Sequence, residues 1–390
     1  MLNKYFVLKL VLILGLMDLL SIIYLMFFYV TSVDVVFLVN FNFILLTILL
    51  GLGALGADFR LVVRNRFFSI IFFLILVSIL KLQIGLLGWE LDFYYILTYS
   101  YALLIMVFSL LFVSRFGVED YLNVFNIFYH FARIYLTLAV FLISVYAILY
   151  FSGVVSYFGM GVNLHYAVPF FVKNGLGFFV ALFSIVILSG KRAVMVNFLV
   201  QYAFYYLYLY RNNRLFLFFL TAFLFSLIYF LVVETNMLYR FEALFTVKWD
   251  DSMSLVAAFG GRFEEILGII NYFKDHPLNL LFGAPPGDFY IYIASTGSHE
   301  YNDPRNFSHV GPASFLFRYG LVFTCFFYLY CFYLLVRYFN PGFPFYLVFV
   351  GILSSSFFGA NLFSDPIAWV FIGFFLKYRH VSLNLKKSLR

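Results

Sequence analysis

The residues best able to do chemistry in this sequence are a few cations and one histidine that lie inside or beside long apolar runs. Lys191 and Arg192 stand between two such runs with almost no polar sequence around them, and Arg318 lies within a third. Arg262 follows two glycines in a polar segment, and His309 comes just before an apolar run that opens with a proline. Charges kept beside an apolar span are costly and mark candidate functional sites. Arginine suits anionic groups such as phosphates, and histidine can take up a proton near neutral pH.

The composition indicates which elements must position these side chains. Of the 390 residues, 65% are hydrophobic and 11% are charged, with a mean hydropathy of +0.99. Soluble domains have about 45–50% apolar and about 25% charged residues. A single globular core cannot bury this much apolar surface, which excludes a soluble enzyme, a disordered chain and a nucleic-acid-binding module. The sequence therefore predicts an all-α, polytopic integral membrane protein, and the net charge of +7 reflects topology rather than a polyanionic partner.

Apolar runs separated by short polar breaks predict about twelve transmembrane helices of roughly 20 residues each. The predicted spans are residues 8–30, 35–55, 67–87, 94–114, 124–150, 154–172, 176–189, 194–210, 215–233, 314–336, 343–360 and 366–377. Treating residues 154–189 as one span would leave the Lys/Arg-rich C-terminal tail outside, against the positive-inside rule. Two spans joined at Lys173 place that tail in the cytoplasm, and Lys191 and Arg192 at the outer face. The alternative is that the parity is wrong and this pair forms an ordinary cytoplasmic turn.

One large polar segment interrupts the spans. Residues 234–311 carry ten of the 18 acidic residues, and we expect them to form a periplasmic loop between transmembrane segments 1–233 and 312–390. Within the loop, helical spacing predicts an amphipathic helix after Arg262 that stops at Pro277 and lies on the membrane surface or caps the bundle. Its predicted apolar face is Phe263, Ile266, Leu267, Ile270 and Phe273, and its predicted polar face is Glu264, Glu265, Asn271 and Lys274.

Four motifs, in order, carry a resemblance to a known family. They are LSGKRA at residues 188–193, Gly261-Arg262 at the start of the loop helix, HPLNLLFG at residues 276–283, and His309 ahead of a span containing Tyr319-Gly320-Leu321. Over roughly residues 160–325 the sequence is similar to the O-antigen polymerase and O-antigen ligase family of bacterial surface-polysaccharide enzymes.

The resemblance implies a glycosyltransferase at the periplasmic face of the bacterial inner membrane, which moves a glycan from undecaprenyl diphosphate to a sugar hydroxyl. Lys191, Arg192, Arg262 and Arg318 would then bind the substrate diphosphate, and His309 would be the catalytic base, with His299 as its main rival. The loop has no Asp-x-Asp motif, so we expect neither metal nor cofactor. The implied partners are the lipid-linked glycan, the bilayer and possible chain-length regulator and flippase proteins, with no nucleic acid.

Several alternatives stay open at this point. The residue after His309 is Val310, where the ligase pattern often has asparagine, and the glycine turn is Ala-Pro-Pro-Gly rather than Gly-x-Gly. Both departures favour the polymerase, with the ligase as the alternative. A flippase or transporter would have short outer loops and charges spread along a central cavity. Arg262 could instead cap or ion-pair within the loop helix, and Arg318 could be an interfacial side chain that reaches toward water.

Overall fold

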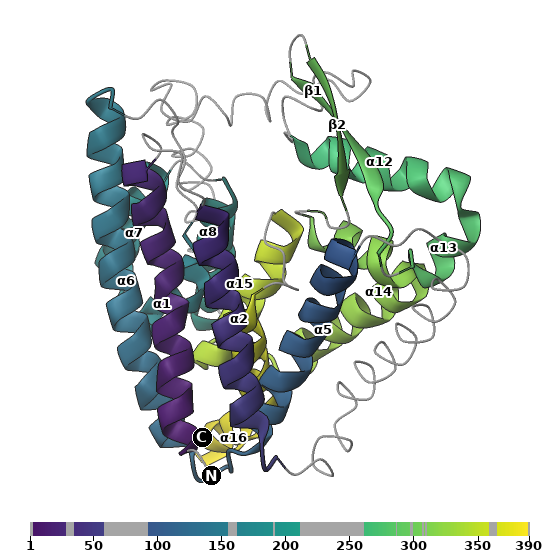
Figure 1. Ribbon diagram of the computed structural model, residues 1–390. Helices are drawn as coiled ribbons and strands as arrows, with labels where there is room; N and C mark the ends of the chain where they lie inside the picture. Colours follow the sequence, from purple (N-terminus) through teal and green to yellow (C-terminus); the bar gives the residue numbers. More distant parts are fainter. Residues whose placement is uncertain are drawn as a thin grey trace.

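The computed structural model describes residues 3–28, 35–57, 93–154, 162–189, 192–210, 261–285, 287–296, 299–305, 308, 310–358 and 365–388. In this part of the chain the long helices are α1 (Lys4–Phe28), α2 (Val35–Ala54), α5 (Phe93–Ser114), α6 (Tyr121–Phe151), α7 (Leu176–Leu188), α8 (Arg192–Leu209), α14 (Gly311–Arg337), α15 (Pro344–Phe358) and α16 (Pro366–Ser388). Two further helices, α12 (Gly261–Asp275) and α13 (Pro277–Phe282), and one hairpin, β1 (Tyr290–Thr296) and β2 (His299–Arg305), lie between α8 and α14 (Figure 1).

The protein is an all-α membrane protein with long apolar helices, as the composition predicts. By length and composition alone, α6 and α14 are the two described helices that could cross a bilayer, and the described residues also contain five shorter apolar helical stretches. The two predicted spans at residues 67–87 and 215–233 lie outside the described residues, so the count of twelve stays a prediction. The other predicted spans correspond to helices, with the exception of residues 154–172.

Residues 162–174 differ from the predicted helical span. The described part of this segment forms three successive 3₁₀ turns, Leu164–Tyr166, Val168–Phe170 and Val172–Asn174. Every side chain from Leu164 to Val172 is buried. Irregular backbone is tolerated at membrane depth only where protein surrounds it. The buried amide of Gln201 supplies part of this support, because its Nε2 donates to the carbonyls of His165 and Leu347, each at 3.0 Å.

The turns nevertheless run in the direction that two crossings require. Tyr166 stacks on Phe371 in the middle of the bundle, and farther along Phe170 packs on Phe125, near the start of α6. The chain then turns at Gly175, which has a positive φ of 89°, and α7 runs back. Lys173 and the start of α8 therefore lie toward opposite ends of the bundle.

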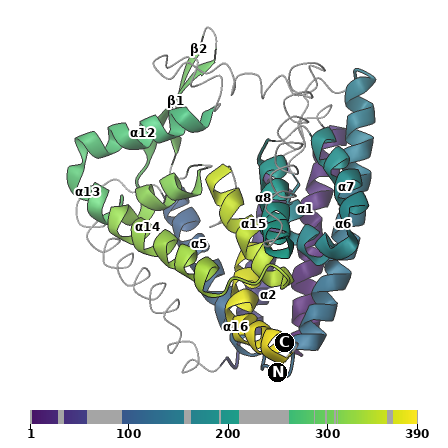
Figure 2. The ribbon, with the colours of Figure 1, turned by 180° about the vertical axis from the view of Figure 1, so that it is seen from behind.

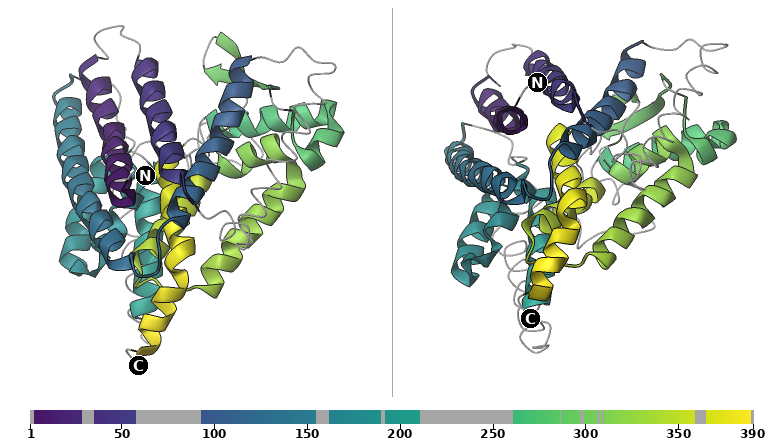
Figure 3. Two further views of the ribbon diagram at one scale, coloured as in Figure 1. Left: turned by 60° about the horizontal axis from the view of Figure 1, so that its bottom comes forward. Right: turned by 90° about the horizontal axis from the view of Figure 1, so that it is seen from below.

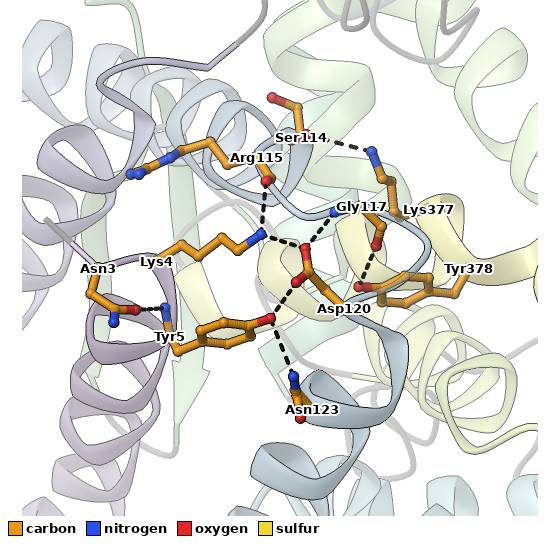
Figure 4. A network of polar contacts seen from close by, with 10 residues as sticks. All are labelled: Asn3, Lys4, Tyr5, Ser114, Arg115, Gly117, Asp120, Asn123, Lys377 and Tyr378. Carbon is orange, nitrogen blue, oxygen red and sulfur yellow. Dashed lines mark hydrogen bonds and ion pairs between the residues drawn. The ribbon is translucent and has the colours of Figure 1, made fainter. Parts of the chain in front are cut away.

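Both termini lie at one end of the molecule, and the hairpin and α12 lie at the other (Figure 1). A polar network ties the terminal end together (Figure 4). Asp120, in the turn between α5 and α6, accepts hydrogen bonds from the side chains of Lys4 and Tyr5 and, at 2.6 Å, from the backbone N–H of Gly117. Tyr378 donates to the Gly117 carbonyl at 3.2 Å. The network joins α1 and α16 to the α5–α6 turn.

Prolines set the start of two helices. Pro312 lies in the first turn of α14, and α16 begins at Pro366. Proline suits this position because the first N–H groups of a helix have no intrahelical partner. Asp365 caps α16, since its Oδ1 accepts from the N–H groups of Ile367 at 2.9 Å and Ala368 at 3.1 Å.

Candidate active site

The described loop elements pack on α14 and form a unit with its own small core. We call α12, α13, the hairpin and residues 311–319 of α14 the loop unit. Its core consists of Ile269, Tyr272, Phe273, Ala284, Tyr290 and Phe317. Complete burial of an aromatic side chain stabilises by about 1.5–3 kcal/mol. The loop unit lies to one side of the helices, with α12 and α13 alongside α14 and away from α6 and α7 (Figures 2 and 3).

The buried face of α12 shares Phe273 with the face predicted from the sequence but otherwise differs from it. Glu264 and Glu265 are 8% and 2% exposed, whereas Leu267 and Ile270 are 40% and 44% exposed. The predicted polar residues Asn271 and Lys274 are exposed. The helix therefore turns two carboxyl groups toward the loop unit, and the prediction that Glu264 and Glu265 lie on the polar face is wrong.

Two motifs of the sequence meet at a close backbone contact. Gly283 ends the HPLNLLFG segment and Gly320 lies inside α14, and their φ angles are 83° and 80°. Gly320 breaks the helical geometry of α14, and the N–H of Ala284 donates to the carbonyl of Phe317 at 2.7 Å. The α13–α14 contact therefore fixes the position of the α14 segment that begins just after His309.

The buried carboxylate of Glu265 connects α12, β2 and the segment just before α14. Glu265 accepts a hydrogen bond from Arg305 Nη1 at 2.9 Å on its Oε1 and one from Ser308 Oγ at 2.8 Å on its Oε2. Arg305 ends β2, and Ser308 lies three residues before α14. The Ser308 hydroxyl also accepts from the N–H of Val310 at 3.0 Å.

A second polar group lies beside the same core. Tyr272 donates to Asp288 Oδ2 at 2.5 Å and accepts from Asn279 Nδ2 at 2.8 Å. Burial, together with the hydrogen bond to Asp288, raises the pKa of Tyr272, so the phenol stays protonated and remains a donor. His276 stacks on the Tyr272 ring with 4.7 Å between the ring centroids, which makes His276 part of the scaffold.

For the predicted base and two of the predicted cations, the structure describes neighbouring residues but not the side chains themselves. His309 and Lys191 lie outside the described residues. Arg192 is the first residue of α8, although its side chain is also outside the described part. The rings of Phe204 and Tyr208, in the second half of α8, pack on Phe339 in the α14–α15 link, with centroids 6.4 and 6.0 Å apart.

That contact orients α8. The α14–α15 link also holds Phe343, which packs on Tyr121 at the start of α6, at the terminal end. Since α8 ends there, its first residue, Arg192, lies toward the opposite end. Gly311 lies against Ser356 near the end of α15, so α14 also begins toward that end. The starts of α8 and α14 are therefore directed to one end of the molecule.

The other two predicted cations are described. Arg262 is the second residue of α12 and is half-buried, and its buried Nε has no hydrogen-bond partner among the residues that the structure describes. The same residues give it no ion pair. A cation at a helix N-terminus also opposes the helix dipole, so capping does not account for Arg262. Arg318 is 4% exposed, which does not fit the alternative of a side chain that reaches toward water.

Comparison with known proteins relates part of the chain to a known family. Residues 177–329 match a family model described as O-antigen ligase. This segment is therefore similar to the O-antigen polymerase and ligase family. It runs from α7 to the second half of α14 and so includes all five predicted site residues. No curated protein and no solved structure matches the chain.

This similarity supports an O-antigen polymerase or ligase type of activity. The fold also brings residues to the start of α14 that the sequence pattern did not indicate. Glu265, Arg305 and Ser308 were missed. The sequence does contain a signal that Glu265 lies on a buried face. Glu265, Ile269 and Tyr272 follow helical spacing as well as the predicted apolar face of α12 does. Among the described residues, no three His, Cys, Asp or Glu side chains gather as metal ligands do.

Proposed function

We propose that the protein polymerises the repeat units of a bacterial surface polysaccharide, such as O-antigen or capsule, at the periplasmic face of the inner membrane. The donor is a glycan on undecaprenyl diphosphate and the acceptor is a sugar hydroxyl of a second lipid-linked unit. The observation that carries the proposal is the extent of the family match, because residues 177–329 contain Lys191, Arg192, Arg262, His309 and Arg318 together.

In the proposed reaction, the bond between the anomeric carbon and the phosphate oxygen breaks while the acceptor oxygen bonds to the same carbon. The acceptor proton passes to His309, and undecaprenyl diphosphate leaves with the bonding electrons. A general base of this kind contributes about 10²–10⁴-fold to the rate. An imidazole suits this role because it titrates near neutral pH.

Arginine and lysine side chains would stabilise the negative charge on the departing diphosphate. Arg262 supports this role best, because its buried Nε faces no acceptor among the described residues and it stands at the positive end of α12. Arg192 is the second candidate, since α8 begins toward the same end of the molecule as α14. Arginine can contact two phosphate oxygens at once, which one ammonium group cannot reproduce.

The polymerase is favoured over the ligase by two features of the sequence. Val310 follows His309 where the ligase pattern often has asparagine, and residues 284–287 read Ala-Pro-Pro-Gly in place of Gly-x-Gly. Ligation of finished chains to lipid A-core is the second candidate. The two reactions share donor chemistry and differ in the acceptor.

His309→Ala tests the proposal. In a polymerase, cells with this variant should carry lipid A-core with a single repeat or unpolymerised carrier-linked units. In a ligase, long carrier-linked chains should accumulate with nothing attached to the core. His299→Ala is the matched control and should have a far smaller effect. Wild-type chain lengths in a stably expressed His309→Ala variant would falsify the proposed role of the histidine.

A further inference from the structure

The segment before α14 is held from both sides by groups of the loop unit. Arg305, four residues before position 309, is paired in the hairpin with Tyr290, whose ring is part of the loop core. Val310, one residue after it, donates its N–H to Ser308 Oγ at 3.0 Å. Arg305 and Ser308 both donate hydrogen bonds to Glu265, so this one carboxylate holds the segment.

The hydrogen bond between Ser308 and Glu265 is buried, and a separate contact of α12 fixes the position of Glu265. The Ser308 side chain is fully buried and Glu265 is 2% exposed, so water does not compete for their hydrogen bond. Glu265 belongs to α12, whose residue Gly268 lies against β1. A Cβ at Gly268 would lie 2.6 Å from the carbonyl oxygen of Ile291. The carboxylate therefore has a defined position relative to the hairpin.

We infer that Glu265 is a positioning residue, which acts through Ser308 to hold the backbone on both sides of position 309, at the start of α14. This inference rests on the proposed function, in which His309 takes the proton of the acceptor hydroxyl. A carboxylate that binds a buried hydroxyl also fixes the direction of that hydroxyl, which leaves its lone pairs for the Val310 N–H. The Arg305 guanidinium neutralises the buried charge.

The experiment compares Ser308→Thr with Ser308→Val. Threonine and valine have nearly the same volume and shape, and only threonine retains the hydroxyl that joins Glu265 to Val310. The reaction is measured with purified full-length protein and undecaprenyl-diphosphate-linked repeat units, extracted from host cells that lack this chain. We expect Ser308→Val to lose roughly ten- to a hundredfold in kcat because misplacement of a reacting group by about 1 Å has an effect of that size. We expect Ser308→Thr to stay within a few-fold of the wild type, and KM to change little in both.

Equal kcat values for Ser308→Thr and Ser308→Val would overturn the inference, as would a loss confined to KM. If neither variant folds because the added methyl group does not fit, Ser308→Ala carries the test, since alanine adds no volume. Its kcat should fall like that of Ser308→Val. An unchanged kcat in a folded Ser308→Ala variant would overturn the inference.

Variants of the acid provide the second arm. Glu265→Gln keeps an oxygen that can accept from Ser308, and Glu265→Met has similar length without an acceptor, so Gln should retain more kcat than Met. Tyr272→Phe is the structural control, because it removes a buried hydrogen bond in the same unit without touching Ser308. Its kcat should stay near that of the wild type even if its melting temperature falls. A loss of kcat in Tyr272→Phe equal to that in Glu265→Met would overturn the positioning role.

His309→Ala separates this inference from the function on which it rests. An active His309→Ala variant contradicts the proposed function itself. An inactive His309→Ala variant with normal kcat in Ser308→Val contradicts the positioning role alone.

Discussion

Gly283 and Gly320, 37 positions apart in the sequence, lie so close to each other's backbone that neither position has room for a side chain. A Cβ at Gly283 would lie 2.5 Å from the backbone nitrogen of Tyr319, and a Cβ at Gly320 would lie 2.5 Å from that of Gly283. Both residues have positive φ angles, which glycine adopts without the strain of an L side chain. This backbone contact connects α13 to the break in α14, and it joins the third and fourth of the motifs that carry the resemblance to the O-antigen polymerase and ligase family.

Alanine at either glycine should therefore weaken the loop unit. A positive φ combined with a ψ of 165° or 174° costs an L residue about 1–3 kcal/mol, and the clash with backbone atoms adds to this. We expect a lower melting temperature for purified Gly283→Ala and Gly320→Ala, and faster proteolysis after α12. Gly177→Ala is the control, because Gly177 lies in α7 with no atom within 4 Å of its added Cβ, and alanine favours a helix. A melting temperature of Gly283→Ala no lower than that of Gly177→Ala would contradict the importance of the contact.

The network around Asp120 predicts a pH dependence at the terminal end. Burial by itself would raise the pKa of Asp120, but hydrogen bonds from Lys4, Tyr5 and the Gly117 N–H outweigh it and lower the pKa. A carboxyl group with a lowered pKa stabilises the fold above its unfolded pKa of about 3.9, and this contribution is lost as the pH falls through the folded pKa.

Asp120→Asn should therefore lower the free energy of unfolding by about 1–3 kcal/mol near pH 7, because hydrogen bonds to a charged group are stronger than neutral ones. The difference from the wild type should begin to shrink below about pH 4, where Asp120 of the unfolded chain takes up a proton, and it should be lost as the pH falls through the lower folded pKa. Thermal unfolding in detergent across this range measures it, and exposed Glu119→Gln is the neighbouring control. A difference that is the same at pH 7 and pH 3 would show that charge plays no part.

The positions of α7 and α8 bear on the predicted topology. Single cysteines at Asp251 and Ser298, in a background without the two native cysteines, should react with an impermeant reagent added to intact cells. Cysteines at Asn212 and Ser388 should react only after the membrane is opened. This pattern follows from the positive-inside rule and from the opposite placement of Lys173 and the start of α8. Protection of position 251 with labelling of position 388 would place the turn at residues 190–192 in the cytoplasm.

The sequence predicted the long helices well because apolar runs of bilayer length leave the backbone few other structures. It predicted residues 162–174 less well. That segment is just as apolar, but Pro169 cannot donate a hydrogen bond within a helix, and the partners that support the turns, such as Gln201, are distant in the sequence. Composition cannot reveal whether an apolar segment is helical or enclosed by protein.

The loop unit shows two further limits of local patterns. In α12, the sets beginning at Phe263 and at Glu265 both follow helical spacing, and only the packing of α12 against Tyr290 selects the second. The hairpin was not predicted, although residues 290–293 are the aromatic and β-branched types that strands favour. Its partner strand is polar and contains Pro304, which weakens the strand signal. Glu265 and Ser308 are 43 positions apart, so no local pattern could pair them.

The last prediction concerns the diphosphate and uses two cations of the same helix. Arg262 and Lys274 lie near opposite ends of α12, and Lys274 is exposed. If Arg262 binds the leaving group, Arg262→Ala should lower the transfer rate roughly ten- to a hundredfold or more, since a charge-assisted contact contributes about 1.5–3 kcal/mol. Arg262→Lys should lose much of the activity too, because a single ammonium group does not replace the guanidinium fork. Lys274→Ala should stay near the wild-type rate.

The same assay separates charge supplied by side chains from charge supplied by a metal. Glycosyl transfer needs positive charge beside the diphosphate as its bond to the sugar breaks, and Arg262 would supply it without a divalent ion. Activity should therefore persist when membranes are treated with EDTA, and it should fall in Arg262→Ala whether or not Mg²⁺ or Mn²⁺ is added. Loss of activity in EDTA with recovery on adding a divalent ion would contradict this assignment. So would an Arg262→Ala variant that regains the wild-type rate at high Mg²⁺.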